Sequence, residues 1–176
     1  GNVGKPSVPM GLAPDGAYSF GLKIGRRSAD LVLCDFLGRM QGQLQITYRW
    51  PVPADVFGFL RDGITRLTTE MTPLQVARIA GIGIAKPHEI WNWHEAVGAP
   101  PGALDIWQGI DFMAEVARFS ALPVWLENDA TAACRAEHAY GRGRAFRDFA
   151  YFFVGSFVGG GIVLNHSVME GATGNA

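Results

Sequence analysis

The sequence has few cysteines, no long apolar run and no excess of either charge. Its 2 cysteines, Cys34 and Cys134, lack the paired spacing of a metal site or disulfide framework, so each is expected to be a small core residue. No apolar run approaches the roughly 18 residues that a membrane-spanning helix needs, which predicts no membrane partner. The first residues lack the apolar core of a signal peptide, so the cytoplasm is the expected location.

The charge balance gives no case for nucleic-acid binding by these residues themselves. The formal net charge is -1, from 15 Lys and Arg against 16 Asp and Glu, whereas a nucleic-acid surface needs a basic patch. The 4 histidines show no metal-ligand spacing, so no metal site is expected here. With 48% hydrophobic residues over 176 positions, the chain is expected to fold around a packed core, as one domain or two small lobes.

What the sequence does have is a hydrophobic period that changes along the chain. Residues 1–15, rich in Gly and Pro, are interpreted as a linker or arm. Alternation of Tyr18, Phe20, Leu22 and Ile24 then begins a run of three antiparallel strands, and helical spacing follows. The expected elements are strands at 17–24, 29–36 and 44–48, a helix at 56–67, a helical turn opened by Thr72-Pro73, a strand at 78–85, an irregular aromatic loop at 86–102, a helix at 106–117, a strand at 122–127, a helix at 128–140 with Gly141 at its C′ position, and strands at 149–155 and 160–165. This order indicates an α/β fold.

Asn128 and Asp129 come where a predicted strand ends and a predicted helix begins. Ligands of open α/β sheets bind beyond the carboxyl ends of the strands. An aspartate there can accept a proton from a substrate hydroxyl, and a neighbouring asparagine can hydrogen-bond adjacent hydroxyls. Both residue types are also favoured as helix N-caps, and the capping and binding roles are compatible.

Glycine, with 23 residues, gathers at two further places where a ligand could approach the backbone. The segment 154–163 contains a glycine-rich turn, which either cradles phosphate or is a tight turn without a ligand. Gly81 and Gly83 lie in a predicted strand, where close approach of a ligand or of a neighbouring helix would explain them, and Gly83 is assigned as a candidate sugar contact. The aromatic residues Trp91, Trp93 and Trp107 either stack on a sugar ring or cover the core.

Together these motifs resemble the ROK family of sugar kinases and sugar-responsive repressors. The segments "LPVWLENDATAACRAEHAYGRG" and "FAYFFVGSFVGGGIVLNHSVMEGATGNA" are similar to a family pattern of a strand, "ENDAnaaA.aE...G", a "GTGIGGGI" hairpin and "G..GnAGE.GH". "GKPSVPMGLAPDGAYSFGLKIG" resembles the join that follows the DNA-binding helices of the family's repressors. The resemblance covers essentially the whole chain. It implies an actin-like fold, the ribonuclease H-like ATPase-domain fold, with a sugar between two lobes.

On this resemblance, residues 16–126 form the N-terminal actin-like lobe and residues 127–176 begin the C-terminal lobe. Asn128 and Asp129 match the sugar-contacting pair, and Asp129 matches the general base of the kinases. Gly25 matches the first glycine of the first phosphate loop. The second phosphate loop is matched by Gly159, Gly160 and Gly161.

Two departures from the kinase pattern concern the nucleotide. Kinases of the family begin with "D-x-G-G-T-K", but here Lys23 replaces the Asp, and Arg26 and Arg27 replace the Gly-Thr. An ammonium in place of a carboxylate reverses the charge offered to Mg²⁺, which prefers oxygen ligands. In the second loop the "GTG" of the pattern appears as Gly155-Ser156-Phe157. Arginines can themselves bind phosphate, so a sugar phosphate or nucleotide held by another route stays an alternative.

The preferred interpretation is therefore the sugar- or amino-sugar-binding region of a ROK-type transcriptional regulator. It predicts DNA binding through an N-terminal domain beyond these residues, a homodimer or homotetramer, and no cofactor in this segment, with zinc only in the C-terminal part that the chain lacks. The first alternative is an ATP- and Mg²⁺-dependent sugar kinase with Asp129 as general base. The second is a degenerate lobe kept for dimerisation. Because the chain ends before the family's "GE.GH" segment, it is expected to be a fragment.

Overall fold

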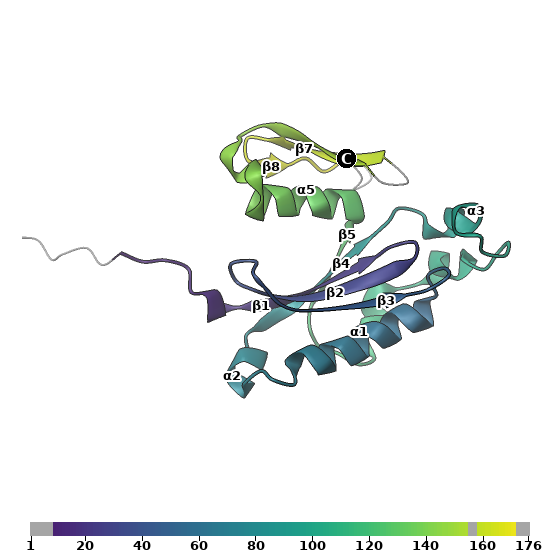
Figure 1. The fold of residues 1–176 in the computed structure, drawn as a ribbon, viewed down its shortest axis with the longest axis horizontal. Helices are drawn as coiled ribbons and strands as arrows, with labels where there is room; N and C mark the ends of the chain where they lie inside the picture. Colours follow the sequence, from purple (N-terminus) through teal and green to yellow (C-terminus); the bar gives the residue numbers. More distant parts are fainter. Residues whose placement is uncertain (1–8, 155–157, 172–176) are drawn as a thin grey trace, which may run out of the picture.

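The computed structural model describes residues 9–154 and 158–171, and it shows an α/β arrangement with two sheets (Figure 1). The strands are β1 Tyr18–Ile24, β2 Ser28–Asp35, β3 Met40–Thr47, β4 Ile79–Lys86, β5 Val124–Asn128, β6 Phe149–Val154, β7 Val158–Leu164 and β8 Ser167–Val168. The α-helices are α1 Pro53–Thr68, α2 Pro73–Val76, α3 His94–Val97, α4 Phe112–Ala117 and α5 Asp129–Tyr140. The 3-10 helices are η1 Pro14–Gly16, η2 Ile90–Trp93, η3 Asp105–Gly109 and η4 Arg142–Ala145.

The first sheet has the strand order β3-β2-β1-β4-β5. The predicted antiparallel run of β1, β2 and β3 is confirmed, and β4 and β5 then add in parallel to β1. The register places Lys23 beside Ala85, Ala85 beside Glu127, and Lys86 beside Asn128. Because β1, β4 and β5 run in the same direction, their carboxyl ends meet at one edge of the sheet, where the candidate residues were expected.

Helix α1 and the first sheet enclose the main hydrophobic core. The predicted helical spacing is confirmed, since Val56 and Leu60 are fully buried and Ile64 packs partly buried against the same cluster. Pro53 occupies the first helical turn, where its missing N–H costs no hydrogen bond. In Figure 1, α1 lies on one side of the first sheet and α5 lies on the other.

The single helix expected at 106–117 is wrong in extent. The chain forms η3 and then restarts as α4, because the Asp111 side chain accepts a hydrogen bond from the Ala114 N–H at 3.0 Å and caps a new helix. The restart changes the buried face: Phe112 is buried, while Ile106 and Met113, expected inside, are 57% and 53% exposed. A further difference is the pair of short helices η2 and α3 inside the loop expected to be irregular. Gly141 follows the last residue of α5, as expected, with an extended backbone (φ -92°).

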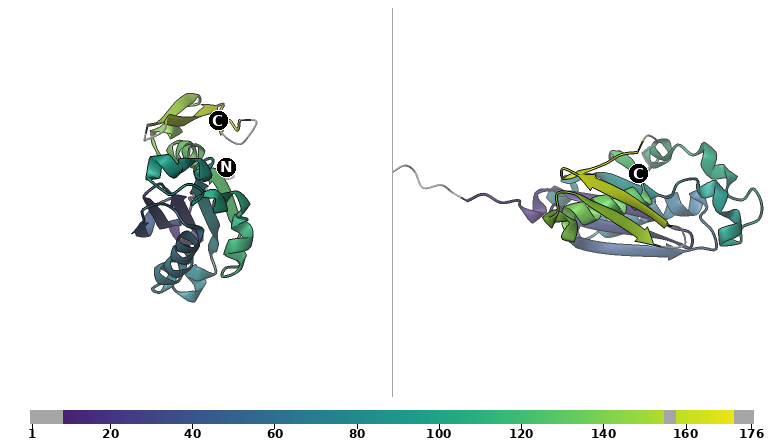
Figure 2. Two further views of the ribbon diagram at one scale, coloured as in Figure 1. Left: turned by 90° about the vertical axis from the view of Figure 1, so that its right-hand side faces the viewer. Right: turned by 90° about the horizontal axis from the view of Figure 1, so that it is seen from above.

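A second sheet, with strand order β6-β7-β8, lies beyond α5. Helix α5 is therefore between the two sheets, and the views in Figures 1 and 2 agree on this layering. The helix packs closely on β7: a Cβ added at Gly161 would lie 2.7 Å from the Cβ and Sγ of the buried Cys134. The division into lobes at residues 126 and 127 stays a prediction.

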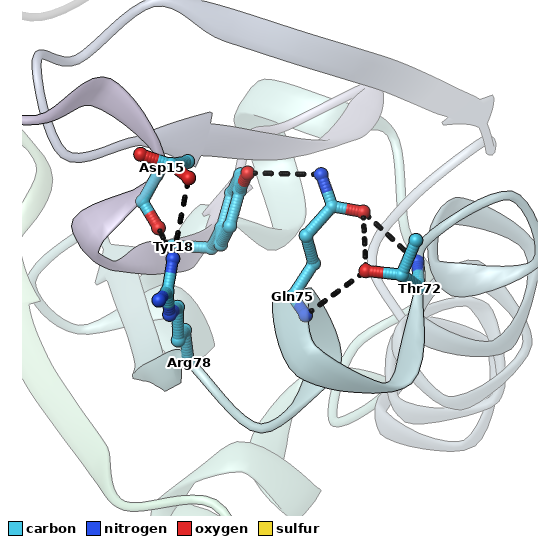
Figure 3. Close-up of polar contacts among 5 residues, drawn as sticks. All are labelled: Asp15, Tyr18, Thr72, Gln75 and Arg78. Carbon is cyan, nitrogen blue, oxygen red and sulfur yellow. Dashed lines mark hydrogen bonds and ion pairs between the residues drawn. The ribbon is translucent and has the colours of Figure 1, made fainter.

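Polar contacts secure the start of β1 to the segment before β4 (Figure 3). Thr72 caps α2 by accepting from the Gln75 N–H at 3.3 Å, which confirms the expected cap, and the Gln75 side chain donates to the Tyr18 hydroxyl at 3.1 Å. Arg78 donates to the carbonyl of Asp15 at 2.8 Å and contacts its carboxylate at 3.2 Å. These bonds fix the point where the N-terminal arm enters the sheet.

Candidate functional site

A cleft of about 470 Å³ opens at the carboxyl-end edge of the first sheet. It lies between this edge, the N-terminus of α5 and strand β7, which are distant in the sequence. The structure thus brings together residues from each of the three predicted motifs: Lys23, Gly25, Arg26, Asn128, Asp129 and Gly159.

Asn128 ends β5 and caps α5. Its side-chain oxygen accepts hydrogen bonds from the Ala130 and Thr131 N–H groups at 3.0 and 3.2 Å, so the capping role is confirmed. The carboxylate of Asp129 accepts from the Ala130 N–H at 2.9 Å. Both side chains still line the cleft. A capped helix start can thus present an acceptor and an amide to a sugar hydroxyl.

The corner between β1 and β2 is closed by bonds of its own. The Gly25 N–H donates to the Ser28 carbonyl at 2.8 Å, and a Cβ at Gly25 would lie only 2.9 Å from that oxygen. The Tyr48 hydroxyl lies 2.8 Å from the Gly25 carbonyl and 2.7 Å from the Ser28 carbonyl, so its proton is shared between two acceptors. Burial raises the pKa of the Tyr48 phenol above its ordinary range, which keeps it a donor. The turn itself therefore requires glycine at position 25.

The two arginines of this corner differ in direction. Arg26 lines the cleft together with Lys23. Arg27 does not line it, because its guanidinium donates to the Arg49 carbonyl at the end of β3. Only Lys23 and Arg26 therefore bring positive charge from this corner to the cleft, a distinction that consecutive arginines in a sequence do not reveal.

The glycines of β7 are explained by close packing. A Cβ at Gly159 would lie 3.0 Å from the Cβ of Ala130 on α5, and a Cβ at Gly160 would lie 2.4 Å from the Tyr151 carbonyl oxygen. Gly159 also lines the cleft, so the assignment of this strand to a phosphate loop stays a prediction. The other predicted members of that loop, Gly155, Ser156 and Phe157, lie outside the described residues.

Gly83 does not line the cleft. It lines a second groove of about 1020 Å³ between the first sheet and α5, which shares Lys23 with the cleft, so its assignment as a sugar contact stays a prediction. Gly81 is explained by the neighbouring strand, because a Cβ there would lie 2.3 Å from the Trp125 ring. Trp107 belongs to the core, where it stacks on Phe112 with ring centroids 5.7 Å apart.

Sequence reasoning missed His88, Glu89 and Asn92, which line the cleft from the segment after β4. Trp93, which was named as a possible sugar contact or core residue, is buried and also lines the cleft. Glu89 has a left-handed backbone (φ 50°), and its carboxylate accepts from the Asn92 side chain at 2.7 Å and lies 3.5 Å from the His88 ring. The signal that could have found them is position, since they directly follow the carboxyl end of a parallel strand.

A second polar cluster also escaped prediction. Arg135 on α5 donates to the Glu127 carboxylate at 2.8 Å and to the Glu170 carboxylate at 2.5 Å. It joins the end of β5 to the segment after β8. Across residues 9–154 and 158–171, no three His, Cys, Asp or Glu side chains gather as a metal site would require, and no helix is long and apolar enough to cross a membrane.

An α/β sheet in the order 3-2-1-4-5, with a cleft at the carboxyl ends of its parallel strands, defines an actin-like ATPase-type fold. Residues 19–176 match the ROK family, and this chain belongs to that family. The resemblance in the motifs and the fold expected from it are both confirmed.

Individual relatives include both regulators and kinases. The chain is 24% identical over 171 residues to the xylose repressor of Bacillus subtilis, covering 97% of this chain and 44% of the repressor. Among solved structures it resembles a ROK family glucokinase from Streptomyces griseus in complex with glucose and AMPPNP (19% identity, TM-score 0.68, 91% of this chain and 48% of the other). It also resembles a ROK family transcriptional regulator, a homologue of the E. coli MLC protein (21% identity, TM-score 0.63, 91% and 40%). The chain thus spans less than half the length of these relatives, and at such identities the solved structures show the fold alone.

Proposed function

We propose that this chain is the sugar-binding region of a ROK-type transcriptional regulator, in which the cleft holds a sugar without transferring a phosphoryl group to it. The observation that carries the proposal is Lys23, which lines the same cleft as Asn128 and Asp129. Lys23 stands where the kinase pattern has its metal- and phosphate-organising aspartate. The residues that match the sugar contacts of the pattern are present, whereas the residue that matches its nucleotide contact is different.

The corner residues support this proposal because they fit Mg²⁺-ATP poorly. Mg²⁺ is bound through carboxylates, waters and phosphate oxygens, and the Lys23 ammonium offers none of these. Gly25 is occupied in closing its own turn through Ser28 and Tyr48, and Arg26 follows where the pattern has a second glycine. The similarity to xylose repressors over 97% of the chain agrees with a regulator.

In this proposal, sugar binding changes how the protein acts on DNA. A sugar can shift a conformational equilibrium only if it binds one state more tightly than the other. DNA binding in this proposal belongs to an N-terminal domain outside these 176 residues, so the cleft acts on it from a distance.

The test uses the whole protein that contains this chain. It is mixed with ATP, Mg²⁺ and a panel of hexoses, pentoses and N-acetylhexosamines, with ADP formation and thermal stabilisation measured in parallel. We expect at least one sugar to raise the melting temperature and to change affinity for DNA, with no ADP formed above the level of Asp129→Asn. Sugar-dependent ADP formation that disappears in Asp129→Asn would overturn the proposal.

That second outcome defines the alternative function, an ATP-dependent sugar kinase. The observation in its favour is Asp129, which lines the cleft at the N-terminus of α5, where a general base can accept a proton from a sugar hydroxyl. Asp129→Asn keeps the shape and the hydrogen-bonding oxygen of the side chain. Lost turnover with retained sugar binding would therefore identify a base and not a damaged helix cap.

A further inference from the structure

We propose that the sugar bound in this cleft carries an anionic group, and that Lys23 and Arg26 are the residues that bind it. The inference deepens the proposed function, on which it rests, by naming the chemical class of the ligand. It starts from the corner between β1 and β2, where two cationic side chains line the cleft. A change that only removed nucleotide binding would not require two positive charges.

The cleft has room for both ends of such a ligand. Its volume of about 470 Å³ lies in the ordinary range for small-molecule sites. Asn128 and Asp129 line it from the start of α5, whereas Lys23 and Arg26 line it from another element, the β1–β2 corner. Sugar hydroxyls at the first pair would leave an attached phosphate or carboxylate to the second pair.

Lys23 is available to a ligand. Its cross-strand neighbours in the first sheet are Asp30 and Ala85. The Asp30 carboxylate accepts a hydrogen bond from the Gln45 side chain at 2.5 Å, and Lys23 forms no ion pair within residues 9–154 and 158–171. An exposed ammonium at the mouth of a cleft adds a point charge for an anion at little desolvation cost.

Arg26 is held by a rigid corner. The Gly25–Ser28 bond and the Tyr48 hydroxyl fix the turn on both sides of the arginine backbone. The guanidinium can bind a phosphate or carboxylate through two parallel N–H donors, and a fixed backbone lowers the entropy lost when it does so. Arg27 bonds the Arg49 carbonyl instead and provides a matched control one residue away.

The acidic groups of the cleft do not oppose this assignment. The Glu89 carboxylate already accepts a hydrogen bond from the Asn92 side chain. Asp129 belongs to α5 and accepts from the Ala130 N–H. Of the charged side chains that line the cleft, Lys23 and Arg26 come from the β1–β2 corner, whereas Glu89 and Asp129 come from other elements.

The experiment measures binding of matched neutral and anionic sugars to the whole protein by calorimetry. The probes are glucose, mannose and N-acetylglucosamine with their 6-phosphates, glucuronate as the carboxylate source, and inorganic phosphate and ADP as anions without a free sugar. Each is measured with the unaltered protein and with Lys23→Met, Arg26→Gln and the control Arg27→Gln.

We expect one phosphorylated sugar or glucuronate to bind about tenfold or more tightly than its neutral partner, the typical effect of a charge-assisted hydrogen bond. Lys23→Met and Arg26→Gln should each reduce the affinity for the anionic sugar severalfold more than the affinity for its neutral partner. Arg27→Gln should change neither value. Comparing the affinities for glucose 6-phosphate and glucuronate shows whether phosphate or carboxylate is the preferred anion.

The possible outcomes distinguish this inference from the proposed function on which it rests. Equal affinity for neutral and anionic sugars, or a preference that survives Lys23→Met and Arg26→Gln, would overturn the anionic ligand and leave the sugar-binding regulator standing. Binding of phosphate or ADP without binding of any sugar would overturn both. Turnover of ATP dependent on Asp129 would overturn only the regulator.

Discussion

The two glycine-containing segments beside the cleft differ in what their glycines do. At the β1–β2 corner, Gly25 closes a turn onto Ser28. In β7, Gly161 makes room for helix α5, whose Cys134 occupies the space of a side chain. The first segment is a local turn with cations, and the second is a packing surface for a helix. The glycines of the two segments thus have unrelated structural reasons.

The comparison also separates the two halves of the cleft. The corner has exchanged the carboxylate of the kinase pattern for Lys23, while the α5 side keeps Asn128 and Asp129 on a capped helix. A glycine kept by packing constraints carries no information about nucleotide binding. The charged side chains, which no packing constraint explains, are the better guide to function.

Gly161→Ala in β7 tests this comparison with the largest expected effect on stability. The new Cβ would lie 2.7 Å from the Cβ and Sγ of Cys134, so α5 and β7 must separate, at a cost of about 1–3 kcal/mol of unfolding free energy. Urea denaturation of the whole protein measures it. Gly83→Ala is the matched control: its Cβ would have 3.8 Å to the nearest atom, so stability should stay level or rise by up to about 1 kcal/mol. Equal effects at both sites would contradict the packing role of Gly161.

Tyr48→Phe tests the corner in the same way. Removing the hydroxyl leaves the Gly25 and Ser28 carbonyls without that donor and should cost about 1–2 kcal/mol, measured by urea denaturation. Arg26 should also lose its fixed backbone, so affinity for an anionic sugar should fall with stability. The control is Tyr140→Phe, because Tyr140 is 61% exposed and surface changes of this kind stay within about 0.5 kcal/mol. A stability loss in the control equal to that in Tyr48→Phe would remove the special role of the corner bond.

Asn128 allows capping to be separated from sugar contact. Asn128→Ala should cost about 1 kcal/mol because two helix N–H groups lose their acceptor. Asn128→Asp keeps an oxygen for the cap but removes the amide donor, so it should preserve thermal stability and weaken sugar binding. The two variants are compared by thermal unfolding and calorimetry. Full sugar affinity in Asn128→Asp would show that this residue is a cap alone.

Much of the fold was predictable because its signals are local. Alternation gave the three antiparallel strands, and the spacing of Val56 and Leu60 gave α1. The helix expected at 106–117 failed because a cap at Asp111 restarts the helix and outweighs an apolar spacing that fits a single helix.

The sequence predicted several of the residues that belong to the candidate site but not how their side chains are directed. Asn128, Asp129 and Lys23 were found because each lies at or near the end of a strand, and parallel strands bring such ends together. The opposite directions of Arg26 and Arg27 depend on a turn closed by Tyr48, a contact that spans 23 positions from Gly25. Such a contact leaves no periodic signal in the sequence.

The smallest expected effect is a pH dependence of folding stability that arises from Tyr48 in the β1–β2 corner. Burial raises the pKa of Tyr48 above its ordinary value of about 10. The unfolded chain therefore releases this proton at a lower pH than the folded chain does. Above about pH 10 the folded state binds more protons than the unfolded state, so the stability contributed by Tyr48 falls as the pH rises.

Urea denaturation of the unaltered protein and of Tyr48→Phe, from pH 7 to pH 10.5, isolates this contribution, because all other titrating groups are common to both. The difference in unfolding free energy should be constant up to about pH 9 and shrink by up to about 1 kcal/mol at pH 10.5. A difference that stays constant over the whole range would mean that the phenol ionises in the folded protein as freely as in water. The corner would then be open to solvent, and a rigid backbone for Arg26 would lose its physical basis.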